Sequence, residues 1–366
     1  MDTFAFIIHP IDPKRDVSRK FPLLGRLLSE RQIDFFSTFF PPVFISEIEG
    51  ITSKSTGKEI KGWFLACPYT PRRMMELPEQ TVYRKIIQTG HLAEKLGAQI
   101  LGLGAFTSVV GDAGVTIAKA LDVPVTTGDS YTVTVAVDAL REAAQVMDIP
   151  LSGATVAVVG ATGAIGQVCA ELLSEDVERL YLIGRRQEAL EALRARLLAG
   201  ARAELIVSTS MDVLADAQLI LTVTSAIQEV IRPEHLQPGS VVCDVARPRD
   251  VSAMVAAARD DILVIDGGMV DVPGPVDFHF NFGFPAGKAY ACMAETIALA
   301  LEGRFEDYTL GKHLTRQRVE EISAMARKHG FRLSGFRSFE REVTQQHIET
   351  VRRNAKKARK LHAAHM

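Results

Sequence analysis

The chain has 366 residues, of which 47% are hydrophobic and 23% are charged, and its formal net charge is −2. These values are typical of a soluble globular protein with room for two domains, and the mildly acidic balance disfavours nucleic-acid binding. No apolar run is long enough to span a membrane, no secretory signal is recognisable, and four cysteines do not make a disulfide framework, so we expect a cytoplasmic protein with reduced thiols.

Residues 1–150 alternate short apolar runs with helical stretches, which predicts an N-terminal α/β substrate domain. Proline or glycine ends most of these elements. This region has no glycine turn of the dinucleotide-binding type. We expect strands at 4–8, 62–67 and 99–103, and helices at 78–96, 112–121 and 126–147.

Residues 151–275 repeat the alternation more regularly, which predicts a Rossmann-like doubly wound domain that binds NADP. In such a sheet, ligands bind beyond the carboxyl ends of the strands. We expect strands at 155–159, 179–183, 203–207, 218–223, 240–245 and 262–265, and helices near 164–174 and 187–199.

The first strand of this domain runs into a glycine-rich turn and then a helix. The three glycines allow a tight turn, let backbone N–H groups approach phosphate oxygens, and let the helix pack close to the strand. The alternative is a structural turn in a domain without a ligand, but the strand-turn-helix context favours a dinucleotide site. The expected cofactor-binding residues are Gly160, Ala161, Thr162, Gly163, Ala164, Ile165 and Gly166.

Two arginines follow the expected strand 179–183. An acidic residue here would bind the ribose hydroxyl of NAD, whereas Arg185 and Arg186 can accommodate the 2′-phosphate of NADP. We therefore predict NADPH as the cofactor; the alternative is a pair of solvated arginines at a helix start. At a later strand end, Thr224 and Ser225 are expected to contact the nicotinamide ribose.

Residues 276–330 are expected to form a catalytic-cysteine segment with helices at about 287–302 and 315–329. Cys292 lies in the first turns of the first helix, where the helix dipole stabilises a thiolate. Lys288, four residues earlier, would add positive charge on the same helical face. From the residues alone, a nucleophile and a buried cysteine are equally good interpretations of this thiol. The other three cysteines are interpreted as buried structural residues.

Four phenylalanines precede this helix and alternate with polar or small residues. The alternation predicts an extended segment with one aromatic face. Packing against a neighbouring strand explains the pattern, and so does a channel for an acyl chain. The four residues are Phe278, Phe280, Phe282 and Phe284.

Residues 331–366 form a basic C-terminal extension with nine Lys and Arg against three Glu. This charge could steer an acidic carrier protein, contact an anionic membrane surface, or belong to a solvated terminus. No group of His, Cys, Asp or Glu has the spacing of metal ligands, so no metal site is expected.

Several further segments are distinctive: LGAFTSVV at 103–110, TTGDS at 126–130, GGMV at 267–270, ACMAE at 291–295 and KHGF at 328–331. With these segments and the glycine turn, most of residues 1–330 resemble the cyanobacterial-type long-chain acyl-carrier-protein reductases, which make fatty aldehydes from acyl thioesters with NADPH. The first ~40 residues match that family poorly, and the basic extension lies outside its pattern.

The resemblance implies that Cys292 accepts the acyl group and that NADPH then reduces the enzyme thioester to an aldehyde. It also implies that a turn at Phe106, Thr107 and Ser108 lies near the substrate. We expect Thr107, Ser108 and nearby backbone N–H groups to stabilise negative charge on the substrate oxygen. The expected partners are acyl carrier protein or acyl-CoA, an aldehyde-consuming enzyme and, through the basic extension, a membrane surface.

Two other functions stay open. One is an NADP-dependent dehydrogenase of the shikimate dehydrogenase or glutamyl-tRNA reductase type, since CDVARPRD at 243–250 is similar to a segment of the latter. The catalytic contexts of both, N-V-T-x-P-x-K and a T-C-N-R-like one, are absent, which disfavours them. The other is a sensor that binds NADP(H) without turnover.

Overall fold

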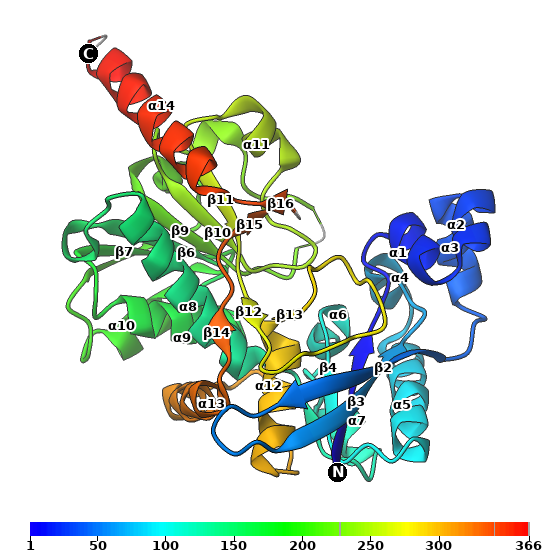
Figure 1. The fold of residues 1–366 in the computed structure, drawn as a ribbon. Helices are drawn as coiled ribbons and strands as arrows, with labels where there is room; N and C mark the ends of the chain where they lie inside the picture. Colours follow the sequence, from blue (N-terminus) through cyan, green and yellow to red (C-terminus); the bar gives the residue numbers. More distant parts are fainter. Residues whose placement is uncertain (227, 340, 365–366) are drawn as a thin grey trace. The chain divides into compact units, whose positions relative to one another are not determined.

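The computed structural model describes residues 1–226, 228–339 and 341–364, and the chain divides into two compact units (Figure 1). Unit 1 comprises residues 1–132 and 270–332, and unit 2 comprises the remainder. Among the described residues, no helix is long and apolar enough to cross a membrane.

Unit 1 is built on a five-stranded sheet in the order β2-β3-β1-β4-β5, parallel except for the edge strand β2. The strands are β1 (Asp2–Ile8), β2 (Val43–Thr52), β3 (Glu59–Ala66), β4 (Leu101–Leu103) and β5 (Val125–Thr126). The helices are α1 (Pro13–Lys20), α2 (Pro22–Leu27), α3 (Glu30–Ser37), α4 (Pro71–Glu76), α5 (Glu79–Lys95), α6 (Phe106–Val109), α7 (Val115–Lys119), α12 (Ala291–Glu302) and α13 (Arg316–His329). Helices α5 and α12 both pack against β1 and β3.

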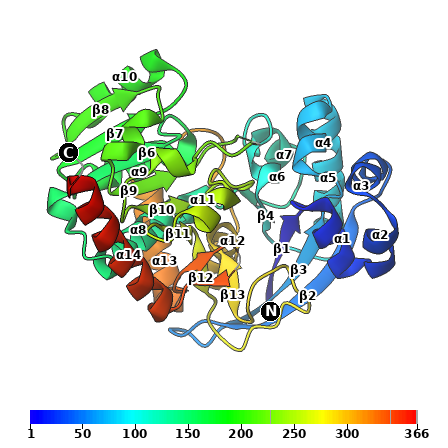
Figure 2. The ribbon, with the colours of Figure 1, turned by 90° about the horizontal axis from the view of Figure 1, so that it is seen from above.

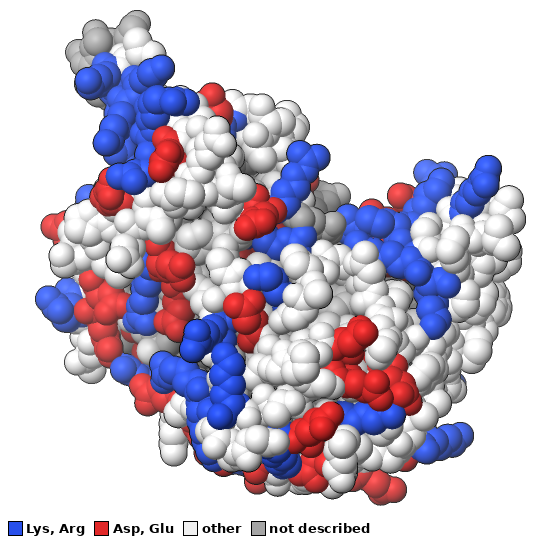
Figure 3. Space-filling model, in the orientation of Figure 1, with Lys and Arg blue, Asp and Glu red and all other residues white. Residues whose placement is uncertain are grey.

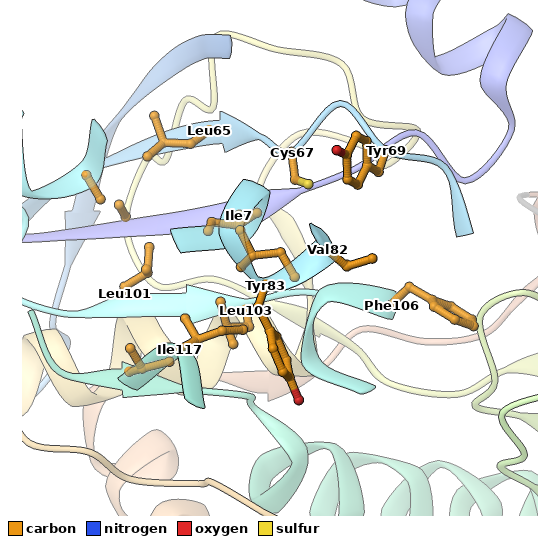
Figure 4. Packing of buried hydrophobic residues seen from close by; sticks show 14 of the residues in the cluster. Ile7, Leu65, Cys67, Tyr69, Val82, Tyr83, Leu101, Leu103, Phe106 and Ile117 are labelled. Atoms are coloured by element: carbon orange, nitrogen blue, oxygen red, sulfur yellow. The ribbon is translucent and has the colours of Figure 1, made fainter. Parts of the chain in front are cut away.

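The core of unit 1 forms because its central strands are apolar along almost their whole length, as expected of parallel strands covered by helices. Ile7 and Leu65 from the sheet pack with Val82 and Tyr83 of α5 (Figure 4). Cys67, just after β3, is buried in the same cluster, and burial raises the pKa of its thiol to about 12. This thiol therefore acts as a small apolar side chain.

Unit 2 contains a six-stranded, fully parallel sheet in the order β11-β10-β9-β6-β7-β8. The strands are β6 (Thr155–Val159), β7 (Arg179–Ile183), β8 (Glu204–Ser208), β9 (Leu219–Thr222), β10 (Val241–Asp244) and β11 (Leu263–Asp266). The helices are α8 (Asp129–Val146), whose first turn belongs to unit 1, α9 (Ala164–Leu173), α10 (Gln187–Leu197), α11 (Ala253–Ala258), α14 (Gln345–Ala364), and the short 3-10 helices at Leu151–Gly153, Asp212–Asp216 and Pro233–His235. This strand order is that of the Rossmann fold, so the expected α/β class and its Rossmann-like domain are confirmed.

The two units differ from the expected division at residues 150 and 275. Helix α8 carries the chain out of unit 1, so the division falls after Thr132, inside a helix, instead of in the loop that follows it. The cysteine segment belongs to unit 1 because α12 packs against β1, β3 and β4 of that unit.

The basic extension also differs from expectation, because it is part of unit 2 and not a separate segment. Ile348, Val351 and Ala355 lie on one face of α14 and are buried. Glu340 and residues 365–366 of this extension lie outside the described residues.

Several elements of the structure were not expected from the sequence. They include β2, β5, α1 to α4, α6, α11, and the short strands β12 (Met269–Asp271), β13 (Lys288–Tyr290), β14 (Arg332–Leu333), β15 (Arg337–Ser338) and β16 (Arg341–Glu342). In contrast, the four alternating phenylalanines do not lie on an extended strand, since residues 278–284 follow bends and His279 has a φ of 47°.

Candidate functional site

In unit 2, the glycine turn joins β6 to α9 by backbone approaches that only glycine allows. Gly160 has a φ of 84°, and a Cβ there would lie 2.6 Å from the carbonyl oxygen of Val223. A Cβ on Gly166 would collide with the carbonyl oxygen of Gly160, because α9 begins close against the turn. Gly163 is the N-cap of α9 and has an ordinary φ of −74°, so its conformation does not require glycine.

Hydrogen bonds join the turn to the neighbouring strand β7, and the start of α9 remains available to bind an anion. The N–H groups of Gly160 and Ala161 donate to the Ile183 oxygen at 2.9 and 3.0 Å. The first N–H groups of a helix have no carbonyl partner within the helix, which includes those of Ala164 and Ile165. Together with the helix dipole they fit the pyrophosphate of a dinucleotide.

Arg185 and Arg186 lie at the carboxyl end of β7 and are both exposed, with Arg186 at the N-cap of α10. Among the described residues, no hydrogen bond or ion pair engages either guanidinium. A Cβ on Gly184 would lie 3.6 Å from the hydroxyl oxygen of Thr162, so this strand end lies beside the glycine turn. The two arginines are thus available to a phosphate next to the dinucleotide turn.

The polar residues after β9 are arranged differently from what the sequence predicts. The hydroxyl of Thr224 donates to the Asp250 carboxylate at 2.5 Å, and its N–H donates to the same carboxylate at 2.8 Å. Thr222 donates to Asp250 as well, at 2.6 Å. Thr224 therefore fixes the strand end, whereas the exposed Ser225 has a hydroxyl that can reach a ligand.

In unit 1, Cys292 is the second residue of α12 and the only one of the four cysteines that is partly exposed. The helix begins at Ala291, so Lys288 lies before it, in β13, and pairs with Asp271 at 3.1 Å. The expected positive charge beside the thiol is therefore not supplied by Lys288.

The expected lowering of the thiol pKa is also wrong. Burial raises the pKa of Cys292 to about 12, and the negative charge of Asp129 adds to this effect. The backbone N–H groups of Met293 and Ala105 lie close enough to lower the pKa, but they do not compensate. The thiol is protonated at neutral pH, so a reaction at its sulfur needs a proton acceptor.

The loop before α8 lies directly against the thiol. Gly128 has a φ of 78°, and a Cβ at this position would collide with the Cα and Cβ atoms of Cys292. The next residue, Asp129, is half-buried at the start of α8. Burial and the negative charge of Glu295 raise the pKa of Asp129 to about 7. Asp129 is therefore a carboxyl group that can gain or lose a proton near neutral pH, close to the thiol.

Glu295 holds this loop in place one turn further along α12. Its carboxylate accepts hydrogen bonds from the Thr126 hydroxyl at 2.5 Å and from the Tyr131 N–H at 2.8 Å. Burial raises the pKa of Glu295, while these hydrogen bonds act against that rise. Sequence reasoning did not identify Gly128, Asp129 or Glu295 as site residues, because only the fold brings TTGDS and ACMAE together.

The turn before α6 provides a third side of the thiol site. Ala105 has a φ of 47°, and its N–H points toward the sulfur of Cys292 closely enough to affect its pKa. The next N–H, of Phe106, donates to Nε2 of His9 at 2.9 Å. Burial lowers the pKa of His9 to about 4, so this ring is a neutral acceptor that fixes the turn.

Thr107 and Ser108 lie in α6, but their hydroxyl groups are engaged within the turn. Thr107 donates to the Gly104 oxygen at 2.8 Å, and Ser108 donates to the Ala105 oxygen at 2.6 Å. Both side chains are buried. In this conformation the two hydroxyls shape the turn, and the backbone N–H groups of Met293 and Ala105 are the donors that act on the thiol.

A row of aromatic rings in unit 1 ends beside the start of α12. Phe278 stacks on Phe64 at 5.6 Å between ring centroids, and Phe282 contacts Phe278 at 5.1 Å. Phe284 follows, at 5.4 Å from Phe282 and 4.3 Å from Tyr290, the N-cap residue of α12. We call these five rings the aromatic row. Phe280 has no ring contact with them in the structure.

The described residues contain no group of three or more His, Cys, Asp or Glu side chains that could hold a metal ion.

The chain is similar to a known family model and to several known proteins. Residues 141–266 match the shikimate/quinate 5-dehydrogenase family model. The chain is 31% identical over 345 residues to a long-chain acyl-[acyl-carrier-protein] reductase from Synechococcus elongatus, covering 90% of this chain and 98% of that protein. It is also 35% identical over 308 residues to the aminotransferase PigE from a Serratia species, covering 83% of this chain.

The chain spans only 36% of the length of PigE. Among solved structures, the L-tryptophan dehydrogenase from Nostoc punctiforme is similar at a TM-score of 0.42 and 13% identity, over 98% of this chain and 88% of that one.

Proposed function

Because the chain belongs to the long-chain acyl-[acyl-carrier-protein] reductase family, we propose that it reduces long-chain acyl thioesters to fatty aldehydes through an acyl group on Cys292. The observation that carries this proposal is the setting of that thiol. Cys292 is partly exposed at the start of α12, with the Asp129 carboxyl group and the Ala105 N–H close to it. A thiol, a proton acceptor and a hydrogen-bond donor are what acyl transfer to sulfur requires.

The cofactor is NADPH, held by residues of unit 2. The turn from Gly160 to Gly166 fits the pyrophosphate, and Arg185 and Arg186 supply planar donors for the 2′-phosphate. Ser225 would contact the nicotinamide ribose of bound NADPH, and Thr224 positions that segment through Asp250. When bound, NADPH supplies a hydride to the carbonyl carbon.

Acyl transfer begins with removal of the thiol proton. Asp129 accepts the proton of Cys292, and the sulfur attacks the thioester carbonyl carbon. A carbon–sulfur bond to Cys292 forms, the bond to the carrier sulfur breaks, and Asp129 returns the proton to the carrier thiolate. A carboxyl group that titrates near pH 7 can serve in both directions.

Reduction of the enzyme thioester produces a tetrahedral adduct on Cys292 with negative charge on oxygen. The Ala105 N–H is the candidate donor for this oxygen, and Thr107 and Ser108 hold the turn that presents it. The adduct then loses its bond to sulfur, which releases the aldehyde and leaves Cys292 to regain a proton from solvent.

The aromatic row is proposed to contact the acyl chain, because it is apolar and ends at Tyr290, two residues before Cys292. Replacing Phe282 or Phe284 with alanine should lower turnover of palmitoyl thioesters more than that of short-chain thioesters. An equal loss for both substrates would mean that the rings serve only packing.

The carrier protein is proposed to dock on α14. Exposed cations at positions 353, 356, 357 and 360 follow the i, i+3, i+4, i+7 spacing of one helical face. Arg352 and Arg359 are engaged elsewhere, the former with Asp148 and the latter with the Pro238 oxygen at 2.9 Å. The four cations, Arg353, Lys356, Lys357 and Lys360, can attract an acidic carrier protein or an anionic membrane, and release of the aldehyde to a consuming enzyme would follow.

The test is to incubate the protein with palmitoyl-acyl carrier protein or palmitoyl-CoA, with and without NADPH. We expect an acyl adduct on Cys292 without NADPH, and hexadecanal with it. Mass spectrometry of peptides containing each of the four cysteines provides the internal control. NADPH binding with neither adduct nor aldehyde would instead support a non-catalytic sensor.

A further inference from the structure

An exposed cluster of apolar side chains on α2 and α3 plays no part in the proposed reaction. Of the fourteen large apolar side chains that are exposed among the described residues, eight fall in residues 21–44. Leu23, Leu27 and Phe39 are 73%, 76% and 70% exposed. We call six of these residues the apolar tip: Leu23, Leu27, Phe35, Phe36, Phe39 and Phe40.

Aromatic rings of the apolar tip contact one another. The ring of Phe35 makes edge contacts with Phe36 at 5.4 Å and with Phe39 at 5.6 Å between centroids. On the opposite side of α3, Ile33 and Ser37 are buried. Ile33 therefore packs inward, whereas Phe35 and Phe36 of the same helix are exposed to solvent.

Polar contacts beneath the apolar tip hold it to the rest of unit 1. Arg73 donates to the Thr38 hydroxyl at 2.9 Å, and Lys85 donates to the Phe40 carbonyl oxygen at 2.8 Å. Thr70 also donates to the carboxylate of Asp34. These contacts present the rings outward from α3, which lies with α2 at the margin of unit 1 (Figure 2).

The charge around the apolar tip is mainly positive. Between residues 13 and 44, the exposed charged side chains are four cations and one acid: Lys14, Arg15, Arg26, Arg31 and Glu30. Within the described part of the chain, no ion pair engages Lys14, Arg26 or Arg31. Figure 3 shows the surface at these helices as white atoms bordered by blue ones.

We propose that the apolar tip docks unit 1 on an anionic lipid bilayer. Phenylalanine and leucine side chains partition into the headgroup and acyl boundary, and neighbouring cations pair with anionic headgroups, so both parts of this surface have a counterpart in a bilayer. The inference rests on the proposed function, whose long-chain aldehyde product is lipid-like. In contrast to α2 and α3, α14 has its apolar residues Ile348, Val351 and Ala355 buried, and Leu361 is its one large apolar side chain that is exposed among the described residues.

The experiment is flotation of the purified full-length protein with vesicles of phosphatidylcholine, alone or mixed with phosphatidylglycerol, without substrate. The tip variant carries L23S, L27S, F35S and F39S. A matched control replaces exposed apolar residues of unit 2, with L198S, M254S and L361S. We expect the tip variant to bind mixed vesicles at least ~10-fold more weakly than the parent, while the control binds like the parent.

A second variant tests the contribution of charge. R26E with R31E should weaken binding to mixed vesicles and leave the weaker binding to pure phosphatidylcholine unchanged. Vesicle binding by the tip variant equal to that of the parent would overturn the proposal. So would loss of binding on charge reversal of α14 alone, or light scattering in which the parent is a dimer and the tip variant a monomer, since a second copy would then cover the apolar tip.

Turnover of a water-soluble short-chain acyl thioester separates this proposal from the proposed function. The tip variant should keep the turnover of the parent, because none of its substitutions lies at the thiol or the cofactor turn. Vesicle binding by a parent protein that lacks reductase activity would sustain the docking surface and refute the reaction.

Discussion

The cofactor turn of unit 2 and the thiol site of unit 1 are assembled from the sequence in opposite ways. The turn is made of consecutive residues, 160–166, and its geometry follows from the spacing of its glycines. The thiol site combines three distant segments, 104–106, 126–131 and 291–295. A local pattern therefore identifies nearly all of the first site, but of the second it identifies only the cysteine.

The two sites also differ in the electrostatics of the helix start that each contains. The start of α9 has backbone N–H groups and glycines, so the helix dipole can act on a bound anion. At the start of α12, burial together with the negative charges of Asp129 and of Glu295, one turn further along the same helix, raises the pKa of Cys292 to about 12. Each unit by which the thiol pKa is raised corresponds to about 1.4 kcal/mol, whereas a helix terminus stabilises a nearby negative charge by only about 1 kcal/mol. Desolvation of the thiol therefore outweighs the helix dipole.

The largest effect is expected from removing the sulfur. Cys292→Ser should abolish aldehyde formation, because the serine hydroxyl is a far weaker nucleophile at neutral pH. The affinity for NADPH should stay that of the parent, since the residues proposed to bind the cofactor belong to unit 2. Fluorescence titration of NADPH and mass spectrometry of the aldehyde product measure the two properties. Aldehyde formation at the parent rate would remove the covalent step.

Much of unit 2 could be predicted because its signals are local. The strands at 155–159 and 179–183 were predicted to the residue, and α9 to within one residue. Four or five buried residues in a row, ended by glycine, specify a parallel strand without reference to the rest of the chain. The units themselves were less predictable, since α8 has no break in its sequence where the chain leaves unit 1.

Unit 1 was predicted less well for three physical reasons. In helices α2 and α3 most of the apolar side chains are exposed, so these helices lack the buried apolar face that indicates a surface helix. The alternating phenylalanines suggested a strand, but bends bring Phe278, Phe282 and Phe284 into one row. The helix expected from residue 287 begins at Ala291, which removes Lys288 from the face of Cys292.

The next effect concerns the proton acceptor. Asp129→Asn should slow acyl transfer to Cys292 by about 10²–10⁴-fold at neutral pH. In the parent the rate should rise with pH through about 7, as Asp129 loses its proton, and the variant should lack this step. The same substitution should have the opposite effect on the rate at which iodoacetamide alkylates Cys292. Removing the negative charge lowers the thiol pKa, so alkylation of the variant near pH 9 should be faster.

The pH dependence of the folding stability provides an independent measurement of the Asp129 pKa. Its pKa is about 7 in the folded protein against an ordinary value of 3.8, so between these values the folded protein binds the proton more tightly than the unfolded chain does. Stability should therefore fall as pH rises from about 4 to about 7, and Asp129→Asn should weaken this fall. Asp122→Asn, at an exposed position, is the matched control. Parallel stability curves for the parent and Asp129→Asn would contradict the raised pKa.

Two glycine substitutions separate the sites directly. Gly166→Ala adds a Cβ against the Gly160 oxygen and should weaken NADPH binding by at least ~10-fold while leaving acylation of Cys292 unchanged. Gly128→Ala adds a Cβ against Cys292 and should have the reverse effects. Gly200→Ala controls for the first, and Gly57→Ala, with a φ of 68° and open space around it, controls for the second. A loss of both properties in either variant would mean general unfolding instead of a local collision.

The smallest effect is expected at the two arginines, because they are exposed and screened by water. Replacing both Arg185 and Arg186 with alanine should weaken NADPH binding by about 10-fold to 100-fold, in line with the ~1.5–3 kcal/mol of hydrogen bonds to a charged group. NADH binding should hardly change, since NADH lacks the 2′-phosphate that the arginines contact. Arg179→Ala, at the other end of β7, is the matched control. An equal loss for both cofactors would assign the arginines to general attraction of anions, and an equal affinity of the parent for NADH and NADPH would show that they do not distinguish the two.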